Sequence, residues 1–154
     1  MTDKQTTSPQ IPFVRLKQDH WTDQEAKNAT VVVDFFQRLM NDHDFDYVAQ
    51  TYSVGPDIQH NRAIPPEMSG VIGYVSYDVK RIISSGDFVV LHSHVTLKAR
   101  HRGNDRKGFI ITDTFRLEDG KPREHWDTMQ AIDLFTCFLM LLTGGAVAND
   151  NPTF

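Results

Sequence analysis

The sequence predicts an α+β domain in which helices come first and an antiparallel sheet follows. Apolar residues at helical spacing fill the first part of the chain, beginning behind a capping box formed by Thr22 and Glu25. Alternation with period two takes over from Phe88 onward and is interrupted by turn sequences such as Asp119-Gly120. Because the two patterns are segregated rather than alternating, a parallel α/β sheet is disfavoured.

Three helices are expected before the sheet. The first runs from Thr22 to Met40, with one apolar face. A short second helix runs from Asp44 to Tyr52, with Tyr52 facing inward. After a short strand at Ile58 to His60, a third helix is predicted from Pro65 to Ile82, because proline suits the first turn of a helix.

Three strands are expected to follow. The run from Phe88 to Arg100 is rich in β-forming residues, and the run from Phe109 to Leu117 alternates strictly. Asp119-Gly120 is a strong signal for a tight hairpin, from which the last strand returns to Gln130. Gly103-Asn104 is a plausible two-residue turn before the middle strand, although a longer loop fits equally well.

A carboxylate interrupts the apolar face of the middle strand. Asp113 shares that face with Phe109, Ile111, Phe115 and Leu117. An acid among buried residues must be paired, kept neutral or held beside a ligand. Asp113 is therefore the first candidate for a functional group, and a structural anchor is the competing interpretation.

The turns set the register, because directly opposed residues share a face. A two-residue hairpin turn places Asp113 opposite Trp126 and leaves His125 and Asp127 on the other face, although one bulge would reverse this assignment. A two-residue turn before the middle strand would place His94 opposite Asp113. The surface predicted around Asp113 comprises Ile111, Phe115, Trp126, Thr128, Gln130 and His94.

The bulk properties bound the class of protein. The 154 residues suit one domain with a sizeable core, and a net charge of -4 argues against nucleic acid or an anionic membrane as the main partner. The single cysteine fits a reducing compartment, and we expect a cytoplasmic protein. The predicted organisation is a flexible extension over 1–20, the domain over 21–133, and an apolar segment with a loose tail over 134–154 that packs on the domain or on a dimer partner.

Several motifs resemble one known family. They are Ile58-Gln59-His60-Asn61, Gly86-Asp87 before His92-Ser93-His94, and a block with Asp113, Phe115-Arg116, Gly120-Lys121, Glu124-His125-Trp126-Asp127 and Gln130. Together they resemble the SnoaL-like family of polyketide-cyclase-type proteins, which have the nuclear-transport-factor-2-like fold, over roughly Thr22 to Ile132. The resemblance implies a cone, in which a curved sheet wraps against three helices around an apolar pocket, and a homodimer formed through the outer sheet face.

The resemblance also implies roles for individual residues. Asp113 matches the acid/base residue of the cyclases, and His94 is the expected assistant. The expected substrate-binding residues are Trp126, His60, Gln130, Thr128, Phe115, Ile111, Tyr52 and His92.

The expected activity is aldol-condensation or proton-shuttle chemistry on an apolar carbonyl substrate, without a metal or an organic cofactor. A metal held by His92, His94 and Asp113 is disfavoured because no supporting pattern surrounds them. The alternative is a non-catalytic module that binds a small ligand or serves assembly in the same fold.

Overall fold

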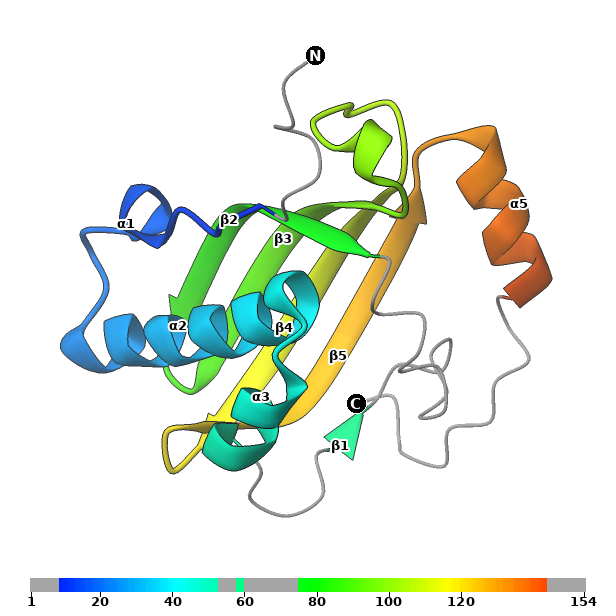
Figure 1. The fold of residues 1–154 in the computed structure, drawn as a ribbon. Coiled ribbons are helices and arrows are strands. Elements are labelled where there is room, and N and C mark those ends of the chain that lie inside the picture. The colour runs from blue at the N-terminus through cyan, green and yellow to red at the C-terminus, as the bar shows by residue number, and fades with distance from the viewer. Residues whose placement is uncertain (1–8, 53–57, 60–74, 144–154) are drawn as a thin grey trace.

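The computed structural model describes residues 9–52, 58–59 and 75–143, and these form an α+β structure (Figure 1). One five-stranded sheet has the order β1-β5-β4-β3-β2, in which β1 runs parallel to β5 and all other neighbours are antiparallel. The strands are β1 (Ile58–Gln59), β2 (Ser76–Ser85), β3 (Phe88–Thr96), β4 (Phe109–Glu118) and β5 (Lys121–Ala131). The helices are α1 (Phe13–Leu16), α2 (Asp23–Phe36), α3 (Phe45–Tyr52) and α5 (Leu134–Thr143).

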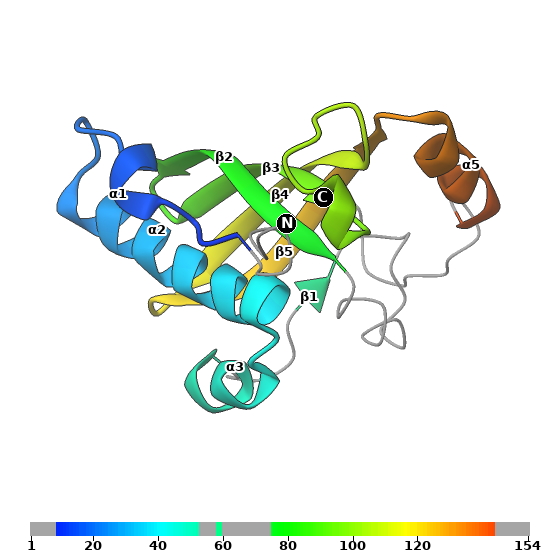
Figure 2. The same ribbon diagram turned by 45° about the horizontal axis from the view of Figure 1, so that its top comes forward.

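Helix α2 lies against one face of the sheet, which we call the inner face, and α3 lies on the same side, past the end of α2 (Figure 2). The core fills the space between α2 and this face. Phe36 of α2 packs edge-on against Tyr77 of β2 and Phe115 of β4, with ring centroids 4.8 and 5.8 Å apart. The described helices leave the opposite, outer face of the sheet open (Figures 1 and 2).

The predicted start of the first long helix is confirmed. The side chain of Thr22 accepts a hydrogen bond from the backbone N–H of Glu25, and the Glu25 carboxylate accepts one from the backbone N–H of Thr22. Helix α2 then continues as a π-helical segment over Gln37–Asp42 and ends at His43, which is left-handed. The predicted second helix is confirmed as α3, and part of the predicted short strand is confirmed as β1.

The prediction of a helix up to Ile82 is wrong, because Ser76–Ser85 forms strand β2. A bulge between Val79 and Arg81 explains the error. It inserts one residue, so that Val79 and Ile82 both face the core although they are three positions apart. This spacing imitates a helical period. The predicted start of that helix at Pro65 lies outside the described residues.

The connection between β3 and β4 is longer than the two-residue turn considered for it. It spans residues 97–108 and contains a 3₁₀ turn at Ala99–His101. The β4–β5 hairpin turns at Asp119-Gly120 as predicted, and both residues have a positive φ. However, a bulge between Arg116 and Leu117 shifts the rest of β5 by one residue.

Both ends of the described chain contact the domain. Ile11, Phe13 and Leu16 pack against the core from the segment around α1. Helix α5 follows β5 and lies beyond its end (Figure 1). Within the described part of the chain, no helix combines the length and apolar character needed to cross a membrane.

Candidate active site

Asp113 lies at the centre of β4 on the inner face and is only 2 % exposed. Because of the hairpin bulge, Asp113 is opposite Asp127, and Phe115 is opposite His125. The Nε2 atom of His125 lies 3.0 Å from Oδ1 of Asp113, within hydrogen-bond distance. The prediction that His125 and Asp127 lie on the other face is therefore wrong, and these two residues are the immediate polar neighbours of Asp113.

His94 is not the partner of Asp113. The long 97–108 connection places Leu91, rather than His94, opposite Asp113. His94 is opposite Ile110 on the outer face, where its Nε2 atom lies 2.7 Å from the carbonyl oxygen of Lys107. Since a carbonyl only accepts, Nε2 carries the proton and His94 holds the connecting loop against the sheet.

The remaining predicted site residues divide between the two faces. Ile111 and Phe115 flank Asp113 on the inner face. Tyr52 of α3 packs edge-on against Phe35, which in turn contacts Phe115. His60 lies outside the described residues. Trp126, Thr128 and Gln130 lie on the outer face, so their predicted placement beside Asp113 is wrong. His92 also lies on the outer face, where its Nδ1 atom is 2.9 Å from Nη1 of Arg81.

The ring of His125 is held by stacking as well as by its hydrogen bond. It lies parallel to the ring of Phe115, with centroids 4.5 Å apart and 11° between the planes. Asp113 is buried behind it, whereas His125 and Asp127 are each partly exposed. Solvent therefore reaches His125 and Asp127, whereas Asp113 is shielded from it.

Burial raises the pKa of the Asp113 carboxyl, because the charged form loses its water. The hydrogen bond and the charge of His125 oppose this shift, while the nearby carboxylate of Asp127 adds to it. The second carboxyl oxygen, Oδ2, is buried and has no hydrogen-bond partner among the described residues. Relative to a solvated carboxyl, burial therefore favours the protonated form of Asp113.

A buried phenol completes the inner face near the acids. The pKa of Tyr77 is raised well above its usual value, first by burial and then by the charges of Asp113 and Asp127. The backbone of Tyr77 is clamped by Asn41 of the π-helical segment, whose amide donates to the Tyr77 carbonyl and accepts from its N–H, both at 2.9 Å. The inner face thus combines two carboxyl groups, an imidazole and a phenol.

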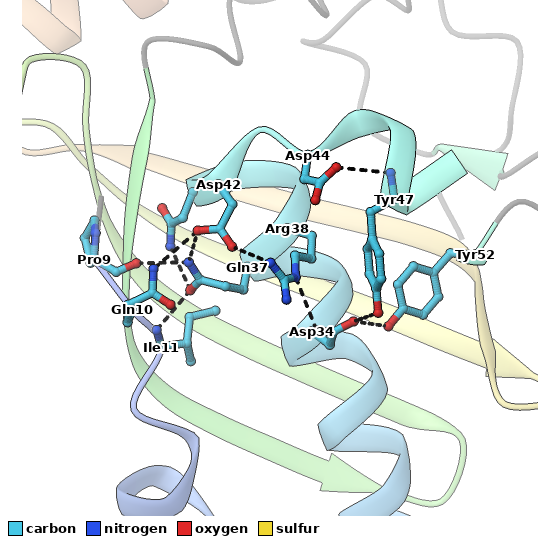
Figure 3. Close-up of polar contacts among 11 residues, drawn as sticks. Pro9, Gln10, Ile11, Asp34, Gln37, Arg38, Asp42, Asp44, Tyr47 and Tyr52 are labelled. Carbon is cyan, nitrogen blue, oxygen red and sulfur yellow. Dashed lines mark hydrogen bonds and ion pairs between the residues drawn. The ribbon is translucent and has the colours of Figure 1, made fainter. Parts of the chain in front are cut away.

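Helix α3 is tied to α2 by a carboxylate shared between two tyrosines (Figure 3). The hydroxyls of Tyr47 and Tyr52 both donate to Oδ2 of Asp34, at 3.0 and 2.5 Å. The phenol pKa of Tyr52 is raised, by burial first and then by this contact. The network fixes Tyr52 beside Phe35, which packs edge-on against Phe115, the residue whose ring stacks on His125.

Among the described residues, Asp113, His125 and Asp127 also offer ligand-type atoms close enough to share a metal ion, all within 4.8 Å of one another. The set considered from the sequence does not assemble, because His92 and His94 lie on the opposite face of the sheet from Asp113. The imidazole–carboxylate hydrogen bond already pairs two of the three groups, an arrangement that equally serves proton transfer.

No family model and no curated protein matches the chain. Solved structures do. A protein from Jannaschia sp. CCS1, provisionally described as a SnoaL-like polyketide cyclase, aligns with a TM-score of 0.57 at 15% identity, over 84% of this chain and 99% of that one. An NTF2-like protein of unknown function from Mesorhizobium loti aligns with a TM-score of 0.55 at 13% identity, over 73% and 98%. AclR from Streptomyces galilaeus, provisionally a hydroxylase, aligns with a TM-score of 0.52 at 19% identity, over 83% and 90%.

The chain therefore has the nuclear-transport-factor-2-like fold, as the sequence motifs predicted. Its likeness to the SnoaL-like and AclR structures is a likeness of fold at this level of identity. The fold hosts many unrelated functions, so the chemistry must be argued from the site.

Proposed function

We propose that the protein is an acid/base enzyme in which Asp113 and His125 move a proton on an apolar carbonyl compound. The observation that carries this proposal is the buried Asp113 carboxyl, hydrogen-bonded at 3.0 Å to a partly exposed imidazole. This pairing replaces the Asp113–His94 pair expected from the sequence. The hydrogen bond joins the Asp113 carboxyl, whose pKa is raised, to the imidazole of His125, which is partly exposed to solvent.

The ionised Asp113 carboxylate would take a proton from the carbon next to the substrate carbonyl, which leaves an enolate. In an aldol closure, the enolate carbon forms a bond to a second carbonyl carbon of the same molecule, and the resulting alkoxide takes up the proton. In an isomerisation, the proton returns to another position. Each acid/base contribution is worth on the order of 100- to 10,000-fold in rate.

The surroundings favour this chemistry. Burial makes Asp113 a stronger base than a solvated carboxylate, and a base with a pKa closer to neutrality exchanges protons with carbon more effectively. The buried side chains of Phe115 and Ile111 lie on either side of Asp113 along β4 and give it apolar surroundings. A tyrosine phenol, whose usual pKa is 10.0, is protonated at neutral pH, and the raised pKa of Tyr77 keeps its hydroxyl a donor for a developing oxyanion.

Proton abstraction can be measured before the natural substrate is known. We would incubate the protein in deuterium oxide with a panel of apolar ketones and diketones and follow loss of the α-proton signals by NMR. Asp113→Asn should reduce exchange by about 100-fold or more, and His125→Gln should also slow it. The matched control is His94→Gln, which changes a histidine on the other face and should leave exchange unchanged.

Chelator treatment should likewise leave exchange unchanged, since the proposed reaction uses no metal. Loss of exchange on chelation, restored by a divalent ion, would contradict the proposal. Equal rates for Asp113→Asn and the unmodified protein would do so as well.

The alternative is a ligand-binding module. The hydrogen bond between Asp113 and His125 is also what a purely structural buried acid would make. In that case the Asp113→Asn variant would bind the same apolar ligands, and the unmodified protein would catalyse no α-proton exchange with any of them.

We also propose a cytoplasmic homodimer, in line with the resemblance and with the single cysteine. Support for pairing comes from the open outer face, where Ile83 is 57% and Phe88 is 44% exposed. Sedimentation equilibrium of the full chain would test it, and a monomer at all concentrations would contradict it.

A further inference from the structure

Helix α5 presents an apolar surface that the described part of its own protomer leaves exposed, apart from the Lys98 ammonium, which lies 5.0 Å from the centre of the Phe135 ring. Leu134 is 89% and Leu141 is 78% exposed. Successive helical residues are about 100° apart, so one set of side chains falls within about 120° of arc. This set, the α5 stripe, comprises Leu134, Phe135, Phe138, Leu141 and Leu142, all exposed.

The other side of the helix is attached to the domain. Thr136 is buried, and Leu139 and Met140 pack against the core. One carboxylate oxygen of Asp133 accepts from the backbone N–H groups of Phe135 and Thr136, and the other accepts from that of Gly108. The helix therefore has a capped and anchored start, and the domain holds the stripe in a fixed orientation.

A helix that is apolar on the side facing water indicates a surface covered in an assembly. A membrane surface is a poor occupant, because interfacial helices carry a charged face and α5 contains no charged residue. The chain's net charge of -4 also opposes anionic lipid. The fitting occupant is an apolar protein surface.

The same chain offers such a surface on the outer face of the sheet. Ile83 pairs with Val90 across β2 and β3, and the Phe88 ring lies 6.4 Å from the ring of Trp126. We call these four residues the outer patch. They come from three different strands of one sheet. None of the four is charged, and the charged residue directly opposite Phe88 on the same face, Arg116, is neutralised by an ion pair with Glu124.

We propose that the α5 stripe of one protomer packs on the outer patch of a second copy of this chain, and that the contact is repeated reciprocally around a two-fold axis. One kind of contact then covers both apolar surfaces, and a closed dimer results. This inference rests on the proposed homodimer and adds the element that crosses to the partner. It does not depend on the chemistry proposed for Asp113.

Sedimentation equilibrium of the full chain tests the proposal with three variants. Phe138→Glu combined with Leu141→Glu, and separately Ile83→Glu, should each raise the dimer dissociation constant by at least 100-fold. Phe45→Glu is the matched control, because Phe45 is an exposed apolar residue of α3, which lies on the opposite side of the sheet from the outer patch, and this variant should remain dimeric. Unchanged circular dichroism would show that the variants fold.

The outcomes separate the two dimer proposals. A monomeric unmodified protein contradicts both of them. A dimer that survives Phe138→Glu/Leu141→Glu contradicts the role of α5 and leaves pairing through the sheet standing.

A second test needs no substitution. Cys137 is the only cysteine of the chain and is exposed on α5. A maleimide-benzophenone attached there and photolysed should crosslink to a partner peptide that contains Ile83 to Val90. Crosslinks between the two α5 helices alone, or within one protomer alone, would overturn the assignment.

Discussion

Asp113, which carries the proposed chemistry, is also a residue whose burial costs stability. Its carboxyl is buried between apolar neighbours, and His125 lies within hydrogen-bond distance of one of its oxygens. Burial outweighs that bond, so the protonated form is favoured relative to a solvated carboxyl. At sites of this kind, substitutions that abolish function often stabilise the fold.

Replacement of Asp113 by asparagine should therefore stabilise the protein in a pH-dependent way. In the unfolded chain the carboxyl ionises near 3.8, whereas in the folded chain its pKa is higher. Between these two values the folded state holds a proton that the unfolded state has lost, so the stability of the unmodified protein falls as pH rises through the window. The amide introduced by Asp113→Asn does not titrate.

Thermal melts from pH 3 to pH 8 would measure this difference. The advantage of the Asp113→Asn variant should be smallest near pH 3 and should grow as pH rises through the folded pKa of Asp113. An advantage that shrinks with rising pH would show that ionised Asp113 is stabilised by its partners.

Asn41 should matter for stability although no sequence motif marks it. It satisfies both backbone groups of Tyr77 at the start of β2. Asn41→Ala leaves a buried N–H and a buried carbonyl without partners, which should cost about 1–3 kcal/mol of unfolding free energy in urea denaturation. Gln18→Ala is the control, because it removes an amide from an exposed contact with the Leu16 carbonyl. If Asn41→Ala loses no more unfolding free energy than Gln18→Ala, the hydrogen bonds from Asn41 to the Tyr77 backbone do not stabilise the fold as we expect.

At the scale of elements, two irregularities decide which side chains meet. The bulge at the end of the β4–β5 hairpin brings His125 and Asp127 to the inner face, and the long 97–108 connection keeps His94 away from it. Both depend on local backbone geometry rather than on hydrophobic pattern, because an extra residue changes the face of every residue beyond it. The alternation that marked Asp113 was reliable, whereas its partners could not be predicted from the turn sequences.

Gly108 shows how tightly the long connection joins the sheet. Its φ is +98°, and a Cβ built there would lie 2.0 Å from the carbonyl oxygen of Val95. Gly108→Ala should therefore cost more than the ~1–3 kcal/mol that an unfavourable backbone conformation alone costs a residue with a side chain. Gly103→Ala is the matched control, since Gly103 also has a positive φ but open space around it. Equal losses of unfolding free energy for the two variants in chemical denaturation would contradict the close approach of Gly108 to the Val95 carbonyl.

At the scale of the whole molecule, the sequence was sufficient for the fold class and for much of the element order. Capping at Thr22, helical periodicity in α2 and alternation in β4 are local signals, and each agrees with the fold. Strand β2 was missed because its bulge spaces Val79 and Ile82 like a helix. The site could be predicted only in part, since it depends on register between strands.

The titration of Asp113 tests the central claim most directly. In protein with ¹³C-labelled aspartate, the Asp113 carboxyl signal can be assigned by its absence in Asp113→Asn. We predict a midpoint above 3.8, which moves higher in His125→Gln and lower in Asp127→Asn, because His125 lowers and Asp127 raises the pKa of Asp113. A midpoint at or below 3.8 would show a fully satisfied structural carboxylate and would contradict the acid/base role.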